Sequence, residues 1–290
     1  MMKTKKPFFS AKNLTVTPYA VWMVLFVLIP IGLVVYFAFT DANGTFTLEN
    51  LSYIKRYAET FWLSVELALI STVICLLLAY PMAFIIAKMP TERQGSAILL
   101  IMLPMWMNFL IRTYAWMTIL ENNGIINRFV GMIAQWLQIE FDGFSMINTN
   151  GAIVLGMVYN YLPYMILPIY TVLTKIDNSL IEAARDLGSS SVHVFRRIIA
   201  PLSVPGVISG ITMVFVPAVS TFIISYLLGG GKTYLIGNII ENYFLGSSGA
   251  INYNVGAALS LLLMILIVVS MGIMNHFDKD SESAGGGMIV

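Results

Sequence analysis

Few residues in this chain of 290 carry the side chains that catalysis or metal binding requires. There is one cysteine, Cys75, and there are two histidines, His193 and His276. A single cysteine excludes an internal disulfide and a cysteine-rich metal site, and the histidines lie too far apart in sequence for a zinc motif. We therefore predict no catalytic residue, no metal site and no cofactor bound by this chain.

A glycine-rich segment invites comparison with a phosphate-binding loop. Residues 229–233 read Gly-Gly-Gly-Lys-Thr, but the phosphate-loop pattern requires a glycine at position 226, where the chain has Tyr226. No predicted strand precedes the segment. We interpret it as a flexible glycine turn, followed by a short helix over residues 234–245.

Only two formal charges, Glu66 and Arg112, lie inside the long apolar stretches of the chain. A charge at the centre of a membrane helix costs about 3 kcal/mol on insertion scales, so each side chain should face a cavity or a partner. The two could pair with each other or reach the membrane interface. The alternative is that Glu66 attracts a cationic substrate near the outer mouth of a pathway.

Aromatic side chains form a second group of candidates, because aromatic faces bind cations. The segment around Pro163 is rich in tyrosine, and proline removes a helical hydrogen bond, so we expect a broken helix that lines a cavity there. Interfacial anchoring or helix packing is the competing interpretation for any single aromatic residue. The candidate pathway residues are Glu66, Trp106, Arg112, Tyr159, Tyr164 and Tyr226.

Residues 175–188 have the pattern of a short amphipathic helix. Ser179 and Glu182 have the spacing of a capping box, apolar residues follow at helical spacing, and Gly188 can end the helix. A second helix over 192–200 would then lead into the next apolar stretch. Taken alone, the pattern fits an ordinary helix parallel to the membrane.

These residues must be positioned by membrane helices, because the composition excludes a soluble domain. Hydrophobic residues make up 58% of the chain and charged residues 11%, where a soluble domain carries about 25% charged residues. Six apolar stretches are long enough to cross a bilayer core of about 30 Å as helices. They are 19–40, 61–87, 98–120, 152–174, 201–228 and 255–275.

The distribution of basic residues predicts one orientation in the membrane. With residues 1–18 inside the cell, eleven lysines and arginines lie in inner segments and four in outer loops, in agreement with the positive-inside rule. We expect both termini in the cytoplasm, with residues 276–290 forming a disordered tail. A signal peptide fits less well, because the first apolar run is too long and no small-residue cleavage site follows it.

The spacing of residues 182–201 resembles the EAA loop of bacterial ABC importer permeases. That loop reads Glu-Ala-Ala, three residues, Gly, nine residues, Ile, one residue, Leu and Pro. In this chain Ala200 replaces the leucine, and the matching positions are Glu182, Ala183, Ala184, Gly188, Ile198 and Pro201.

The likeness covers about residues 20–275. Within the family the chain is most similar to PotB-type permeases of spermidine/putrescine importers. The segments that carry this similarity are 79–84, 108–114, 182–188, 228–230 and 235–238.

The resemblance implies a type I (MetI-like) importer permease with six transmembrane helices over 19–275 and a cytoplasmic coupling helix. It implies that this helix docks into a separate ATPase, through Glu182, Ala183, Ala184, Asp186, Gly188, Ile198 and Pro201. It also implies a PotC-type second permease, two PotA-type ATPases that bind ATP and Mg, and an extracellular PotD-type binding protein. This chain would hydrolyse nothing itself.

The apolar stretches of this chain contain few groups that could bind a cationic substrate. A cation pathway needs carboxylates, and the apolar stretches of this chain supply one, unless the partner permease supplies others. A permease for an anion or a metal chelate is therefore an alternative within the family. Outside it, a secondary transporter would show inverted repeats and more spans, and a membrane enzyme would show clustered His, Asp or Glu at membrane depth.

Overall fold

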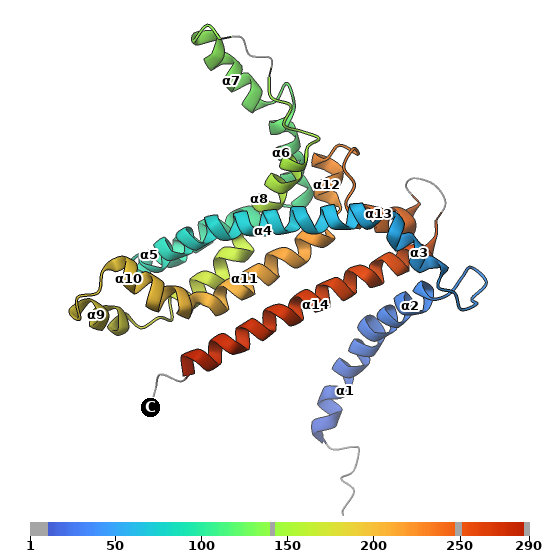
Figure 1. The fold of residues 1–290 in the computed structure, drawn as a ribbon, viewed down its shortest axis with the longest axis horizontal. Helices are drawn as coiled ribbons and strands as arrows, with labels where there is room; N and C mark the ends of the chain where they lie inside the picture. Colours follow the sequence, from blue (N-terminus) through green and yellow to red (C-terminus); the bar gives the residue numbers. More distant parts are fainter. Residues whose placement is uncertain (1–10, 140–142, 247–250, 287–290) are drawn as a thin grey trace, which may run out of the picture. The chain divides into compact units, whose positions relative to one another are not determined.

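The structure of the chain, a computed structural model, is built almost entirely from helices (Figure 1). It describes the backbone of residues 11–139, 143–246 and 251–286. Within these segments the β-structure is limited to one isolated bridge between Thr40 and Phe46. The predicted all-α fold class is thus confirmed.

The described residues include five helices that are long and apolar enough to cross a membrane. A sixth span is possible if a bent pair of helices counts as one crossing. The five are Thr17–Ala38, Ala58–Ala87, Asn150–Leu173, Ser191–Ser220 and Tyr253–His276, and the bent pair is Thr91–Trp106 with Phe109–Trp136.

The chain divides into two compact units. One consists of Met1–Arg56 and Ile240–Met264, and the other of Tyr57–Ile239 and Ile265–Val290. The helices that carry most of the predicted site residues belong to the second, larger unit.

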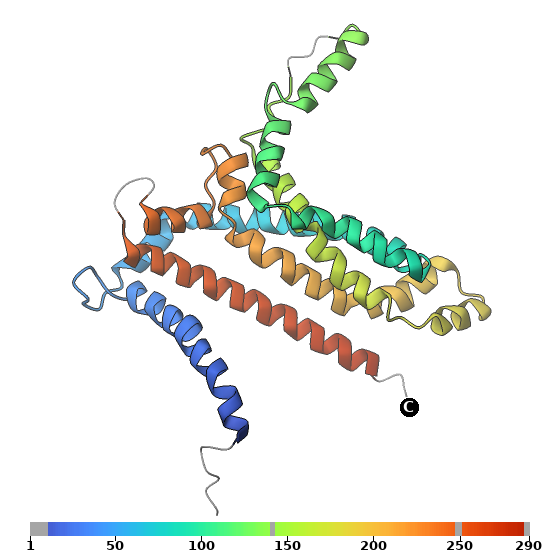
Figure 2. The ribbon, with the colours of Figure 1, turned by 180° about the vertical axis from the view of Figure 1, so that it is seen from behind.

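Three long helices, α4 (Ala58–Ala87), α8 (Asn150–Leu173) and α11 (Ala200–Ser220), lie side by side in the larger unit (Figures 1 and 2). Glycines allow α11 to approach α8 closely. A Cβ atom at Gly206 would lie 2.8 Å from the Pro168 carbonyl oxygen, and one at Gly210 would lie 2.6 Å from Met165 Sδ. Such close packing of small residues holds helices together in lipid, where moving apolar surface from lipid into a helix contact gains little free energy.

The predicted span over 98–120 is not one straight helix. It consists of α5 (Thr91–Met102), the 3₁₀ turn η2 (Leu103–Trp106) and α6 (Phe109–Leu120). The bend between Thr91–Trp106 and Phe109–Trp136 is 86°. Pro104 supplies no N–H within the 3₁₀ turn, and Met107 is extended. The Asn108 side chain then starts α6 by accepting a hydrogen bond from the Leu110 N–H at 2.8 Å.

The predicted span over 201–228 is also interrupted, between the end of α11 and α12 (Ile223–Leu228). The break lies at Thr221 and Phe222, four residues after Pro217. Phe222 is the N-terminal cap of α12, and its carbonyl accepts hydrogen bonds from the Tyr226 N–H at 3.0 Å and from Asn238 Nδ2 at 2.8 Å. The described half-helices α6 and α12 pack against each other.

The break predicted at Pro163 is wrong. Helix α8 runs without interruption through Pro163 and Pro168. Each proline removes only one backbone donor, and α8 is held by packing against both α4 and α11. In this chain the breaks therefore occur in the two neighbouring spans rather than in the tyrosine-rich one.

The smaller unit contains α1 (Ala11–Met23), η1 (Val24–Leu28), α2 (Ile29–Ala38), α3 (Glu49–Arg56) and the beginning of α14 (Tyr253–Gly286). Its core is formed by Ala38, Ala257, Ala258 and Leu261. The Asn254 side chain donates to the Thr40 carbonyl at 2.6 Å, which fixes the end of α2 against the start of α14.

Two further helices lie in segments between the spans. The helix α13 (Ile236–Leu245) agrees with the short helix predicted over 234–245. The helix α7 (Ile125–Trp136) lies between the spans predicted over 98–120 and 152–174, where no helix is predicted above.

The tail differs from the expectation of disorder over 276–290. Helix α14 continues to Gly286, because no proline or turn sequence stops it before the glycine run. Residues 287–290 lie outside the described residues.

Candidate functional site

The segment with the EAA-like spacing forms a short helix, α9 (Asn178–Asp186). It begins differently from the prediction, because the cap is Asp177 rather than the Ser179 and Glu182 pair. The Asp177 carboxylate accepts a hydrogen bond from the Ser179 backbone N–H at 2.9 Å. This hydrogen bond lowers the pKa of Asp177 below its ordinary value, because it favours the charged form.

The predicted helix stop at Gly188 is confirmed. Gly188 has φ +80°, its N–H donates to the Arg185 carbonyl at 2.8 Å, and the Ser189 N–H donates to the Ala184 carbonyl at 3.0 Å. This pair of hydrogen bonds is the Schellman motif, which needs a residue with positive φ. A Cβ atom at Gly188 would have no neighbour within 4 Å, so the requirement is one of backbone conformation and not of space.

Helix α9 has no buried residue in this structure. Its surroundings include large exposed apolar side chains: Leu180 is 50% exposed and Leu187 is 87% exposed. Glu182, Ala183 and Asp186 are exposed and Ala184 is half-buried. Exposed apolar side chains bordered by charges are typical of a protein interaction surface. We call α9 with Leu187 and Gly188 the α9 surface.

A second helix connects the α9 surface to the long helices. The helix α10 (Ser191–Val194) is capped by Ser190 Oγ, which accepts from the His193 N–H at 3.3 Å. It continues through the π-helical turn η3 (Phe195–Ile199) directly into α11, so the second helix predicted over 192–200 is confirmed as the beginning of a longer one. Ile198 is half-buried in this turn, and Pro201 is exposed in the first turn of α11.

Aromatic contacts join this connection to α4. The Phe195 ring lies edge-on to the rings of Tyr80 and Phe84, with centroid distances of 5.8 and 5.7 Å. The Tyr80 hydroxyl shares a hydrogen bond of 2.8 Å with Ser203 Oγ on α11. A displacement of α10 would therefore act on both α11 and α4. Figures 1 and 2 show α9 and α10 together at one end of the α4, α8 and α11 group.

The predicted pathway residues are not brought together by the structure. Glu66 is exposed on α4, whereas Arg112 is buried on α6 with Nε and Nη1 lacking hydrogen-bond partners. The structure therefore does not show the mutual pairing that was one of the alternatives for these two charges. Among the described residues, no ion pair joins Glu66 on α4 to Arg112 on α6.

The aromatic candidates occupy different environments. Trp106 is 73% exposed and Tyr164 is 41% exposed. Tyr159 is half-buried and packs edge-on against Trp116, with a centroid distance of 5.3 Å, which fits helix packing. Of the predicted pathway residues, Tyr226 alone lines the pocket described next.

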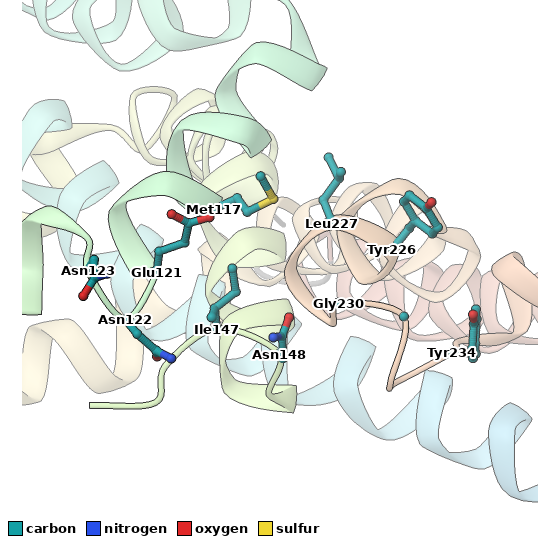
Figure 3. Close-up of a pocket in the computed structure, with 11 residues that line it drawn as sticks. Met117, Glu121, Asn122, Asn123, Ile147, Asn148, Tyr226, Leu227, Gly230 and Tyr234 are labelled. Carbon is teal, nitrogen blue, oxygen red and sulfur yellow. The ribbon is translucent and has the colours of Figure 1, made fainter. Parts of the chain in front are cut away.

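A pocket of about 720 Å³ lies where the end of α6, the start of α8 and the end of α12 meet. Figure 3 shows Met117 and Glu121 on one side, Tyr226 and Tyr234 on the other, and Ile147 and Asn148 between them. We call it the Glu121 pocket. Its lining residues are Met117, Glu121, Asn122, Asn123, Ile147, Asn148, Tyr226, Leu227, Gly230, Gly231 and Tyr234.

The glycine turn after α12 forms one wall of this pocket. Gly230 has φ +58° and Gly231 has φ +69°, which confirms the predicted turn. A Cβ atom on Gly230 would collide with Asn148 Oδ1, and the positive φ also favours glycine there. The Asn148 backbone N–H donates to the Leu228 carbonyl at 2.9 Å, which holds the turn against the start of α8.

Sequence reasoning missed Glu121, Asn148 and Tyr234 as members of one site. Asn148 lies 86 residues before Tyr234 along the chain, and Glu121 lies farther still. The three residues meet because α12 turns away from α11 at the Thr221–Phe222 break. The glycine run was the one local signal that pointed to this place.

A second pocket, of about 740 Å³, belongs to the smaller unit. Asp41, Glu49, Tyr36, Tyr53 and Tyr253 are among its lining residues. Asp41 Oδ1 accepts hydrogen bonds from the Thr45 and Asn43 N–H groups at 2.8 and 2.9 Å. These bonds, that of Thr45 most strongly, lower the pKa of Asp41.

Comparison with known proteins places the chain among transport proteins. Residues 14–282 match the family model described as "Binding-protein-dependent transport system inner membrane component". The spermidine/putrescine transport system permease protein PotB of Haemophilus influenzae is 37% identical over 279 residues, which cover 92% of this chain and 94% of the relative.

Two solved structures show the same fold at low identity. A bacterial ABC transporter involved in the import of the acidic polysaccharide alginate matches with a TM-score of 0.71 and 17% identity, covering 93% of this chain and 95% of that one. The MetNI methionine ABC transporter matches with a TM-score of 0.54 and 15% identity, covering 77% and 95%.

Proposed function

The chain belongs to the family of binding-protein-dependent transport inner membrane components, and from that premise we propose that it is the permease subunit of a polyamine importer. Members of this family are multi-pass inner membrane proteins of ABC importers, and they are not enzymes. The observation that supports polyamines such as spermidine and putrescine is the 37% identity to a PotB permease over nearly the whole chain.

The α9 surface is the proposed contact with the ATPase. Its apolar side chains are exposed although this unit has a packed interior, and a partner surface would cover them. The residues proposed to act in coupling are Glu182, Ala183, Ala184, Asp186 and Gly188 on the α9 surface, with Ile198 and Pro201 at the start of the helix that follows.

The remaining components are proposed on the same grounds. A PotC-type permease would form the other half of the pathway, two PotA-type ATPases would bind ATP and Mg, and a PotD-type protein would deliver the substrate from outside. Both termini and the α9 surface would then lie in the cytoplasm, and the Glu121 pocket on the outer side. The helix breaks beside α6 and α12 fit alternating access, in which discontinuous helices surround the substrate route.

Uptake by the reconstituted four-component system tests the proposal. We expect ATP-dependent accumulation of labelled spermidine or putrescine that requires the binding protein and the ATPase. Accumulation of an inorganic anion or a metal chelate, without polyamine uptake, would favour the alternative substrates. Uptake that persists without the ATPase would contradict the assignment of the α9 surface to coupling.

A further inference from the structure

The Glu121 pocket contains one carboxylate and no opposing charge. Among the eleven described residues that line it, Glu121 is the only charged one, and the polar remainder consists of three asparagines and two tyrosines. The Glu121 carboxylate makes no ion pair or side-chain hydrogen bond within the described part of the chain. Its charge is therefore available to a ligand.

The backbone around Glu121 strengthens the negative potential. Glu121 is the C-terminal cap of α6, a helix of 12 residues. The C-terminal end of a helix carries a partial negative charge from its unpaired carbonyl groups. A cation beside the carboxylate would be stabilised by both, whereas an anionic ligand would be repelled by both.

The opposite wall of the pocket offers aromatic rings. Tyr226 is 60% exposed and Tyr234 is 42% exposed, and Figure 3 places both across the pocket from Glu121, with Ile147 and Asn148 between them. Aromatic faces attract ammonium groups, and Ile147 with Leu227 can contact methylene groups. The volume of about 720 Å³ lies within the range of small-molecule pockets.

We propose that the Glu121 pocket binds a linear organic polycation, with one ammonium group at the Glu121 carboxylate and the rest of the molecule extended toward Tyr226 and Tyr234. This inference rests on the proposed polyamine transport. It adds a site within this chain at which the substrate is held on the outer side before it enters the pathway. The partner permease is then not the sole source of carboxylates.

Glu59 provides a matched control for Glu121. Both are exposed glutamates of the larger unit, and Glu59, in the first turn of α4, is not among the residues that line the pocket. If a general negative surface attracts the substrate, Glu59→Gln and Glu121→Gln should have the same effect. If the pocket binds it, only the change at Glu121 should matter.

The test is calorimetric titration of spermidine into the purified permease–ATPase complex without the binding protein. We expect Glu121→Gln to weaken binding about tenfold, as for the loss of one charge-assisted hydrogen bond, and Glu59→Gln to leave it unchanged. Tyr226→Leu should weaken binding, while Tyr226→Phe, which keeps the ring, should not. ATPase activity of each variant checks that the complex is intact.

The outcomes separate this inference from the proposed function. Equal binding by Glu121→Gln and wild type, or equal losses in Glu121→Gln and Glu59→Gln, would overturn the pocket assignment while polyamine uptake by the wild type still stood. A wild-type complex that neither binds nor transports spermidine would overturn the proposed function and this inference with it.

Discussion

Gly188 links a backbone angle to energy coupling. Its φ of +80° is accessible to glycine, costs a branched residue about 1–2 kcal/mol, and is tolerated by asparagine. We expect Gly188→Val to insert normally in the membrane but to uncouple ATP hydrolysis from uptake, because the end of α9 would be displaced. Paired assays of ATPase activity and uptake measure this.

The control at this position is Gly188→Asn, which should retain most uptake because asparagine adopts positive φ. Full uptake by the valine variant would show that the turn is not needed for coupling.

Asp177 predicts how the α9 surface responds to pH. Its folded-state pKa is lowered from 3.8 by the Ser179 hydrogen bond. A lowered pKa contributes stability that is present above the unfolded pKa and is lost as the pH falls through the folded pKa. Amide hydrogen exchange in α9, corrected for its intrinsic pH dependence, should therefore show constant protection between pH 5 and 8.

Replacement of the cap gives the complementary measurement. Asp177→Ala should speed exchange in the first turn of α9, and Asp177→Asn should have a smaller effect because asparagine also caps helices. Equal exchange in the alanine variant and the wild type would assign the cap to another group.

Gly230 and Gly231 form a matched pair in the pocket wall. Both have positive φ, but a Cβ atom on Gly230 would collide with Asn148, whereas the nearest atom to one on Gly231 is the Tyr234 hydroxyl at 3.7 Å. We expect Gly230→Ala to destabilise the protein by more than about 1 kcal/mol beyond Gly231→Ala. Thermal unfolding of the purified complex measures the difference. Equal effects would mean that the Asn148 side chain can move aside without loss of stability.

At the scale of elements, the break between α11 and α12 is held by one buried side chain. Asn238 is 2% exposed. It donates to the Phe222 carbonyl at 2.8 Å and accepts from Ser225 Oγ and from the Leu235 N–H, at 2.5 and 3.0 Å. Through Asn238, the segment 235–238, noted in the sequence for its family likeness, is thus tied to the first turn of α12 directly after the break.

Asn238→Ala should therefore lower the stability of the complex. The Leu235 N–H would lose its acceptor, and a buried polar group left without a partner costs about 1–3 kcal/mol. The Phe222 carbonyl would keep the Ser225 Oγ and Tyr226 N–H donors. Asn123→Ala, at an exposed position, serves as the control in thermal unfolding. A midpoint for Asn238→Ala equal to that of the control would show that other groups hold the break.

Local signals account for the elements that were predicted correctly. Long apolar stretches must be helical in lipid, and Gly188 and the glycine run each mark a turn through their own conformational freedom. The break at Asn108 also has local causes, in Pro104 and the Asn108 cap. The break at Thr221 and the continuous helix through Pro163 depend instead on packing and on Asn238, a residue distant in sequence. The same holds for the Glu121 pocket, whose walls come from three elements.

At the scale of the whole molecule, the orientation in the membrane is directly testable. The natural cysteine, Cys75, is fully buried, so it should give little background with a membrane-impermeant maleimide. In cells without the partner ATPase, which would cover the α9 surface, Leu187→Cys at a position 87% exposed should react only after the membrane is permeabilised. Asn123→Cys, at an exposed position, should react in intact cells, and the reverse pattern would invert the proposed topology.

The unbroken helix over Ser191–Ser220 has a mechanical consequence. Its 30 residues extend about 45 Å at 1.5 Å per residue, with the α9 surface beside one end and the Thr221–Phe222 break at the other. When a rigid helix of that length tilts by about 10° about its first turn, its far end moves by about 8 Å. A small displacement of the α9 surface by a bound ATPase would thus become a larger one at the Thr221–Phe222 break. The helix after this break, α12, carries Tyr226 and Leu227 of the pocket wall.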